Sequence, residues 1–460
     1  MEQKSCFGEF ARYSVLSILG TLGVSCYILA DTFFISEGMG INGLAALNLA
    51  IPIFNFIYGI GLMLGMGGAT KCSICKSRGD REQGNQVFSH AVSAGLAAGL
   101  FFFVAGLFFS GELAEALGGE GQVLAMTDTY LKWLLLFAPA FILNNILLCF
   151  VRNDGGPQLS TAAMLVGNFA NILFDYIFIF PMGMGILGAI LATGFSPVLS
   201  ILCMSPHWLR KKNHFSLVRL IPSAGLLQQE LSIGLPSLIA QVSAGVVMIV
   251  FNMLILGLEG NRGVAAYGVV ANIALVVTAT YNGLSQGMQP LVSSFYGGGR
   301  EREYRQVLRY GLSTMLVISA ALYLIVFLLA EPIAGLFNSE RDMLMQAMAA
   351  EGLALYFLSN VFVGFNMLLA TFFASVEKPV PAHILSLLRG FLLIIPLAFL
   401  MAKLWGMTGI WLTYPAAEFL TAAVGLALYR RFRAAGKPRA GHGKIQDSLC
   451  SCHNSPGVLK

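Results

Sequence analysis

Twelve runs of mainly apolar residues follow one another along the chain, and this succession constrains the fold more than any other feature. One helical crossing of a hydrocarbon layer about 30 Å thick needs about 20 such residues. In lipid, the backbone of each crossing must also satisfy its hydrogen bonds within its own segment. We therefore predict an all-α membrane protein with twelve transmembrane helices. The runs fall at roughly 13–36, 45–70, 88–110, 131–150, 158–181, 184–204, 233–256, 264–289, 309–330, 352–375, 382–402 and 408–429.

The low content of charged residues excludes a soluble protein. Only 11% of the residues are charged and 57% are hydrophobic, whereas soluble domains carry about 25% charged residues. The net charge of +5 does not indicate a nucleic-acid partner, because the basic residues lie in short loops between apolar runs rather than in one patch. We expect the lipid bilayer as the partner and no nucleic acid.

The eight cysteines show neither a disulfide framework nor a metal site. They are scattered, and several lie inside apolar runs. The Cys72–Cys75 pair and the Cys450, Cys452 and His453 group each lack a second ligand pair at a suitable spacing. We expect free thiols, no metal and no cofactor.

Basic residues predict the orientation. Most of the 28 Lys and Arg residues fall in alternate loops, whereas Lys132, Arg262, Arg341 and Lys403 fall in the others. Short loops rich in Lys and Arg face the cytoplasm. We therefore expect both termini to be cytoplasmic and the protein to be a multi-pass component of a bacterial cell membrane. No cleavable signal precedes the first run, so that run is expected to stay in the protein.

An internal repeat divides the runs six and six. A shift of about 220 residues aligns Gly43-Leu-Ala-Ala with Gly263-Val-Ala-Ala, and Gly61 and Gly65 with glycines of the second half. Six is an even number, so the halves enter the membrane in the same orientation, related by an axis along its normal. We predict two six-helix lobes with a transport path between them. The expected units are a first lobe at 1–206, a cytoplasmic linker at 207–231, a second lobe at 232–432 and a disordered tail at 433–460.

Charges inside the apolar runs locate the candidate site, since each costs a few kcal/mol at the centre of a membrane helix. Asp31 and Asp175 both belong to the first lobe and lie roughly 27 Å along their helices at about 1.5 Å per residue. Asn171 shares the helical face of Asp175, Asn168 lies nearly on it, and Thr193 reaches a similar level. Their oxygens suit Na⁺ or a shared proton. The structural alternative is that each Asp caps a broken helix or bonds to a neighbouring backbone.

The second lobe lacks this pair of acids. A shift of 221 places Asn252 opposite Asp31, and runs 7, 8 and 10 contain no carboxylate. Coupling to a cation is therefore expected in the first lobe alone. Arg389 and Glu418 both lie near the middle of the membrane and are expected to form a structural ion pair, with Arg389 as the one buried base.

Motifs in both halves resemble the multidrug and toxic compound extrusion (MATE) family. In the first half these are Asp31-Thr-Phe-Phe, Gly43-Leu-Ala-Ala-Leu-Asn-Leu-Ala-Ile-Pro, Arg152-Asn-Asp-Gly-Gly-Pro and Asn171-Ile-Leu-Phe-Asp175. Gln286-Gly-Met-Gln-Pro290 and Gly406-Met-Thr-Gly-Ile-Trp resemble the second half. The likeness covers about residues 10–430, and bacterial MepA-like exporters are the subgroup that the chain resembles.

This resemblance implies a function. The family exports amphipathic, often cationic organic molecules in exchange for H⁺ or Na⁺, so the chain is expected to be an antiporter and not an enzyme. Asp31, Asn171, Asp175 and Thr193 match the cation and proton site of the family's first lobe. The family's alternative Na⁺ site uses carboxylates of spans 7 and 10, which are missing here.

The walls of the path and two alternatives remain open. Side chains on runs 2, 8 and 10 are candidates for the substrate cleft, although Met and aromatic residues at helical spacing usually pack. A flippase for a lipid-linked precursor would need a strongly basic cleft, and a membrane-embedded enzyme would need a nucleophile or an acidic cluster. We expect a monomer. The cleft candidates are Met63, Met66, Tyr281, Gln286, Tyr356, Asn360 and Asn366.

Overall fold

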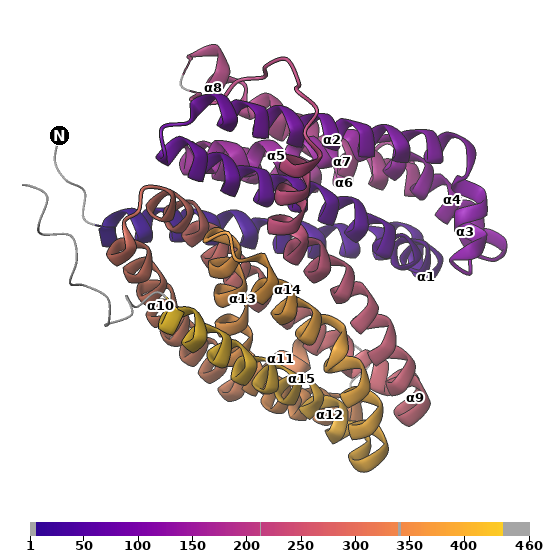
Figure 1. The fold of residues 1–460 in the computed structure, drawn as a ribbon. Coiled ribbons are helices and arrows are strands. Elements are labelled where there is room, and N and C mark those ends of the chain that lie inside the picture. The colour runs from indigo at the N-terminus through magenta and orange to yellow at the C-terminus, as the bar shows by residue number, and fades with distance from the viewer. Residues whose placement is uncertain (1–5, 212, 339–341, 436–460) are drawn as a thin grey trace, which may run out of the picture.

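A computed structural model describes residues 6–211, 213–338 and 342–435, and this part of the chain is nearly all helical. Figure 1 shows two groups of helices that lie across each other. This confirms the predicted all-α fold with two lobes. The predicted disordered tail lies outside the described residues from residue 436 onward, as do Cys450, Cys452 and His453.

The first lobe is built by the helices up to residue 209. Its longest element is α1 (Cys6–Ser77), which runs through both of the first two apolar runs. The others are α2 (Arg81–Phe108), α3 (Ser110–Ala116), α4 (Gly121–Leu136), α5 (Ala138–Asn153), α6 (Pro157–Ile179), α7 (Gly185–Met204) and α8 (Pro206–Leu209).

The second lobe repeats this plan. It begins with α9 (Ala224–Gly297), which also spans two apolar runs. The others are α10 (Glu301–Leu328), α11 (Ala330–Leu336), α12 (Met343–Tyr356), η1 (Phe357–Ser359), α13 (Asn360–Ser375), α14 (Pro379–Leu387), η2 (Leu388–Leu392) and α15 (Ile394–Ala435).

The predicted twelve spans are recovered when bent helices are divided at their bends. Within the described residues, eight helical units are long and apolar enough to cross a membrane, and nine if the bent pair of α4 and α5 is one span. Three of these units contain, in their interior, a glycine in the left-handed conformation, namely Gly40, Gly260 and Gly406, with φ of 63°, 62° and 58°. Each of the three therefore carries two of the predicted runs.

Left-handed backbone positions recur at the spacing of the sequence repeat. Gly40 and Gly260 are 220 residues apart, as are Gly79 and Gly299, and all four have positive φ. Gly185 and Gly406 follow at a spacing of 221. Side chains with a Cβ rarely adopt this conformation, so the duplicated glycines place equivalent breaks at equivalent points of both lobes.

Each lobe has its own apolar core, and each core receives the start of a helix from the other lobe. Phe10, at the start of α1, is buried in the second core, where it packs near Tyr310 with ring centroids 5.9 Å apart. Leu226 and Leu231, at the start of α9, pack against the first core. The long helices α1 and α9 therefore cross, and this crossing is the main contact between the lobes.

Glycines allow the crossing helices to approach closely. A Cβ built on Gly67 of α1 would lie 2.0 Å from the Glu230 carbonyl oxygen of α9. Reciprocally, a Cβ on Gly234 would lie 1.9 Å from the Met63 carbonyl oxygen. No side chain larger than hydrogen fits at either point, as is common where membrane helices pack closely.

The lobes touch at one end and separate at the other. We call the end with Cys6, Ser77 and Glu301 the inner end, and the end with Gly40 and Gly260 the outer end. Contacts between the lobes run from the inner end to the level of Ser25, whose hydroxyl lies 3.5 Å from the Leu275 carbonyl oxygen. Toward the outer end the two groups of helices diverge (Figure 1).

The segment between the lobes is bound to the first lobe. Side chains of α2 pair with its backbone: Asn85 Oδ1 accepts from Ser216 N at 3.0 Å, and Ser89 Oγ accepts from Val218 N at 3.0 Å. The predicted linker reached residue 231, but α9 already begins at Ala224. The connection that is free of helix is therefore shorter than expected.

Candidate functional site

Asp31 and Asp175 meet inside the first lobe, near its outer end. Asp31 lies on α1, Asp175 on α6, and their carboxyl groups are within hydrogen-bonding reach of each other. Asp175 is fully buried and Asp31 is 7% exposed. One oxygen of each, Oδ1, has no hydrogen-bond partner among the described residues. The sequence placed the two aspartates at a similar depth along their helices, and in the structure they lie next to each other.

Asn171 and Thr193 complete the polar surroundings of Asp175. With the amide oriented to satisfy its neighbours, Asn171 Nδ2 donates to Asp175 Oδ2 at 3.1 Å. Its Oδ1 then accepts from Thr193 N at 3.3 Å and from Thr193 Oγ1 at 3.2 Å. The opposite orientation would set two acceptors against each other, so this one is preferred. Asn171 stands one turn from Asp175 on α6 and Thr193 faces it from α7.

Two tyrosines that the sequence analysis did not select lie beside the pair. Tyr130 of α4 is 4% exposed, interacts electrostatically with both aspartates, and its hydroxyl is hydrogen-bonded to the Thr193 side chain. Tyr27, one turn before Asp31 on α1, also interacts with both aspartates. No sequence signal separates these tyrosines from packing aromatics, because their role depends on which helices become neighbours.

Asn168 lies earlier on α6 than Asn171 and Asp175, about two turns before Asp175. It is 8% exposed, and its Nδ2 has no hydrogen-bond partner among the described residues. A Cβ on Gly23 of α1 would lie 3.0 Å from this nitrogen. Asn168 therefore contacts α1 two turns away from Asp31, whereas Asn171 contacts Asp175 directly.

The geometry of the pair suits the capture of one small positive charge. Two carboxylates this close repel each other when both are ionised and desolvated, and either a shared proton or a small cation relieves the repulsion. The oxygens of Asp31, Asp175, Asn171 and Thr193 are hard ligands of the kind that bind Na⁺.

Polar contacts join the two lobes at the inner end, and we call this set of contacts the inner seam. Arg152 donates to Gln286 Oε1 at 2.6 Å, and the Gln289 Nε2 donates to Thr70 Oγ1 at 2.6 Å. The hydroxyls of Ser77 and Ser294 lie 3.2 Å apart. Because all three contacts pair the first lobe with the second, the seam closes the inner end of the molecule.

A three-residue ionic contact belongs to the same seam. Glu377, which follows α13, accepts from Lys71 Nζ at 2.6 Å and from Arg78 Nη2 at 3.0 Å. Glu377 has φ of 52°, which is unusual for a residue other than glycine. The repeat places it opposite Gly155, which has φ of 84°, so the second lobe carries a charged side chain where the first has none.

Arg389 and Glu418 form the pair that the sequence predicted. Arg389, in the π-helical turn η2, donates from Nε and Nη2 to Glu418 Oε1 at 3.0 and 2.9 Å. Asn366 Nδ2 donates to Glu418 Oε2 at 2.7 Å. Glu418 is 1% exposed. The expectation that Arg389 would be the one buried base was wrong, since Lys71 and Arg152 at the inner end are also buried.

The other predicted cleft residues lie in different places. Tyr281 and Tyr356 are part of the second core, where Tyr281 pairs with Ser319 at 2.7 Å and Tyr356 stacks on Tyr414. Asn360 is also buried there, and its Nδ2 has no hydrogen-bond partner among the described residues. Met66 packs against the first core. Gln286 and Met63 reach the contact between the lobes.

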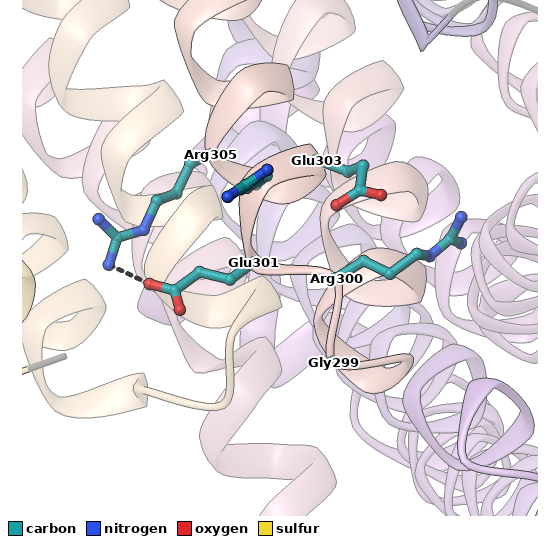
Figure 2. A pocket seen from close by; sticks show the side chains of 6 residues that line it. Gly299, Arg300, Glu301, Glu303 and Arg305 are labelled. Carbon is teal, nitrogen blue, oxygen red and sulfur yellow. Dashed lines mark ion pairs between the residues drawn. The ribbon is translucent and has the colours of Figure 1, made fainter. Parts of the chain in front are cut away.

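Two hollows on the surface lie at the inner half of the molecule. One, of about 490 Å³, is lined by charged residues of the turn into α10, where Glu301 pairs with Arg305 (Figure 2). The other is a mainly apolar groove of about 540 Å³ between α1, α9 and α14, with Met63 and His383 in its walls. Neither is lined by Asp31 or Asp175, which are buried within the first lobe.

Glu230 is a further buried acid, and it falls within the predicted linker. It lies in the second turn of α9, is 0% exposed, and neither of its side-chain oxygens has a hydrogen-bond partner among the described residues. The predicted linker included this residue because the next apolar run begins only at about 233.

Comparisons with known proteins agree with this architecture. A family model described as MatE matches residues 17–177 and 236–400. The chain is 29% identical over 429 residues to the multidrug export protein MepA of Staphylococcus saprophyticus, covering 93% of this chain and 94% of that protein. It is 28% identical, with the same coverage, to the MepA protein of Staphylococcus aureus.

A solved structure has the same fold. It is described as the outward-facing conformation of a multidrug resistance MATE family transporter of the MOP superfamily. It superposes with a TM-score of 0.88 at 23% sequence identity and covers 93% of this chain and 96% of its own. At this level of identity the likeness concerns the fold.

Proposed function

The chain belongs to the MatE family of membrane transporters, and from this premise we propose that it exports amphipathic, often cationic organic compounds in exchange for H⁺ or Na⁺. The relatives named above are multidrug export proteins, which supports this substrate class. We further propose that the inner end faces the cytoplasm of a bacterial cell, that both termini lie there, and that the protein acts as a monomer.

The observation that carries the proposal is the pair of Asp31 and Asp175 within the first lobe. The two carboxyl groups come from different helices, α1 and α6. A proton or cation that binds between them changes the attraction between those helices. Ion binding can therefore be coupled to the position of the first half of α1, which also reaches into the second lobe through Phe10.

The proposed cycle is an exchange. In the state with the inner seam closed, an ion from outside binds at Asp31 and Asp175, weakens substrate binding and bends the first half of α1. The lobes then rock so that the inner seam opens, the ion leaves to the cytoplasm, and a new substrate binds. Coupled exchange requires that the ion and the substrate each bind with different affinity to the state with the inner seam closed and the state with it open.

The flippase alternative has less support. Recognition of a pyrophosphate group needs several buried cations that are free to bind it. Among the described residues, the buried bases Lys71 and Arg152 are engaged by Glu377 and Gln286, and Arg389 is engaged by Glu418.

Transport in everted vesicles tests the proposal. Uptake of a fluorescent cationic dye into the vesicles is measured while ΔpH and ΔNa⁺ are imposed separately. Dye transport driven by one of the gradients is expected for the wild type, and Asp31→Asn is expected to abolish it at unchanged protein abundance. Glu115→Gln, a change at an exposed acid of the outer end, serves as the matched control.

Wild-type transport in Asp31→Asn would contradict the assigned coupling site. A flippase would instead show no ion flux that depends on the dye. The separate gradients also identify the coupling ion.

A further inference from the structure

Glu230 occupies an unusual position in the inner seam. Its backbone carbonyl lies at the closest approach of α1 and α9, opposite Gly67. Its side chain is 0% exposed, and both Oε atoms lack a hydrogen-bond partner among the described residues. A buried carboxyl group without hydrogen bonds is costly when it is ionised, so this side chain needs a physical explanation.

None of the charged neighbours is hydrogen-bonded to it. Lys71 of α1 is close enough to interact electrostatically with Glu230, but its Nζ is bonded to Glu377 at 2.6 Å. Arg78, the other partner of Glu377, is 49% exposed and therefore solvated. Both cations are bonded to Glu377, so an ionised Glu230 would be a fully buried carboxylate with no hydrogen-bonded cation in the closed seam.

The other titratable side chains on the neighbouring helices form no hydrogen bond with the Glu230 carboxyl group. The Cys72 thiol of α1 interacts with it electrostatically. On α14, the His383 Nε2 contacts the Ser232 carbonyl oxygen at 2.6 Å, and on α2 the His90 Nε2 contacts the Ile221 carbonyl oxygen at 2.9 Å. Both imidazoles are thus held by backbone oxygens rather than by the carboxyl group.

We propose that Glu230 is a proton-binding site of the second lobe that controls the inner seam. It holds a proton while the seam is closed. When the lobes part, water reaches the carboxyl group, which releases its proton to the cytoplasmic solution and becomes a solvated carboxylate. This inference rests on the proposed alternation of the lobes, but it concerns a site separate from Asp31 and Asp175.

The direction of the pH response follows from this assignment. The closed seam binds one proton more than the open seam, so acidification of the cytoplasmic side favours closure and alkalinisation favours opening. For one linked proton, the ratio of open to closed molecules changes by about tenfold per pH unit in the steep range. Protonation of the Asp31 and Asp175 pair acts in the opposite direction, because in the proposed cycle it promotes opening of the inner seam.

The test measures the separation of the lobes at the inner end. Spin labels are placed at Arg81, at the start of α2, and at Arg302, in the first turn of α10; both side chains are exposed. Pulsed electron–electron distance measurements are made between pH 6 and 9 in lipid nanodiscs, on a cysteine-free protein that retains export. The substitutions Asp31→Asn and Asp175→Asn are added to remove the response of the other site.

In that background the ratio of the long-distance to the short-distance population is expected to rise about tenfold per pH unit over the steep range. Glu230→Gln is expected to keep, at every pH, the distance distribution that the background shows at its lowest pH, because it mimics the protonated side chain. Glu9→Gln is the matched control, since Glu9 precedes Glu230 by the repeat spacing of 221 and is part-exposed on α1. It is expected to keep the pH response.

An unchanged pH response in Glu230→Gln would overturn the inference. A protein that remains at the short distance at every pH would overturn both the inference and the proposed rocking of the lobes. Absence of ion-driven transport by wild-type vesicles would overturn the proposed function alone, because the distance measurement uses no substrate.

Discussion

The closest approach between the lobes leads to a prediction that depends on packing geometry. A Cβ added at Gly67 would lie 2.0 Å from the Glu230 carbonyl oxygen and 3.0 Å from Gly234 N. Contacts between carbon and oxygen normally begin at about 3.3 Å. The substitution Gly67→Ala therefore forces the backbones of α1 and α9 apart by about 1 Å. Backbone atoms stand on both sides of the contact, so rotation of a side chain cannot relieve it.

The expected size of the effect follows from the cost of overpacking. Inserting a methyl group into a well-packed contact costs about 1–3 kcal/mol. This cost falls on the closed seam and disappears when the lobes part. The gain in helix propensity from Gly to Ala, about 1 kcal/mol, is the same in both states and cancels. The ratio of open to closed molecules is therefore expected to rise about 5- to 150-fold.

The distance measurement between labels at Arg81 and Arg302 reports this ratio directly. Gly257→Ala is the matched control, because a Cβ at this helical position of α9 would meet nothing within 4 Å. Gly67→Ala is expected to populate the long distance, whereas Gly257→Ala is expected to match the wild type. Equal distributions in the two variants would refute the reasoning. Gly234→Ala affects the same contact, so its combination with Gly67→Ala should be less than additive.

Two further predictions concern the polar groups inside each lobe. Arg389→Met removes two hydrogen bonds from the buried Glu418 and is expected to lower the free energy of unfolding in detergent by about 3–5 kcal/mol. Addition of Glu418→Gln should recover most of that loss, and no recovery would argue against a structural pair. Tyr130→Phe removes the hydroxyl bonded to Thr193 and is expected to raise the half-saturating concentration of the coupling ion about fivefold, for about 1 kcal/mol. An unchanged ion dependence of transport would separate Tyr130 from the site.

The sequence predicted the pair of Asp31 and Asp175 because charge is rare in apolar runs and helical arithmetic fixes depth and face. Asn171 followed from its spacing of one turn on the same helix. Tyr130 could not be predicted in this way. Its place beside the pair depends on how α4 packs against α7, and an aromatic residue in an apolar run gives no sign of which neighbour it will meet.

The predicted cleft residues also show that sequence does not determine which neighbours a side chain meets. Tyr281 and Tyr356 lie on helices of the second lobe, as expected, but both are turned into its core. Depth along a helix is fixed by residue number, whereas the rotation of a helix about its axis is fixed by packing. The contact of Lys71 with Glu377 was likewise out of reach, because 306 residues separate the two.

Glu230 was missed for a local reason. The linker was predicted to reach residue 231 because the apolar run that follows it begins at about 233. The α9 helix nevertheless begins at Ala224, where Ser223 caps it by accepting from Leu226 N at 3.3 Å. Its first turns are stabilised by packing on the first lobe, through Leu226 and Leu231, rather than by lipid.

The duplicated lobes differ at several positions that carry a charged side chain in one lobe and an uncharged residue in the other. At the outer half, Asp31 of the first lobe corresponds to Asn252 of the second, so the buried acid pair exists once. At the inner end, Glu377 corresponds to Gly155, and its left-handed backbone costs about 1 kcal/mol that a glycine would not. A side chain that is kept at such a position is favoured by what it contacts, and here it holds Lys71 and Arg78 of the other lobe. The first lobe thus carries the groups suited to bind the ion, whereas the second carries Glu377, which joins the lobes at the inner seam.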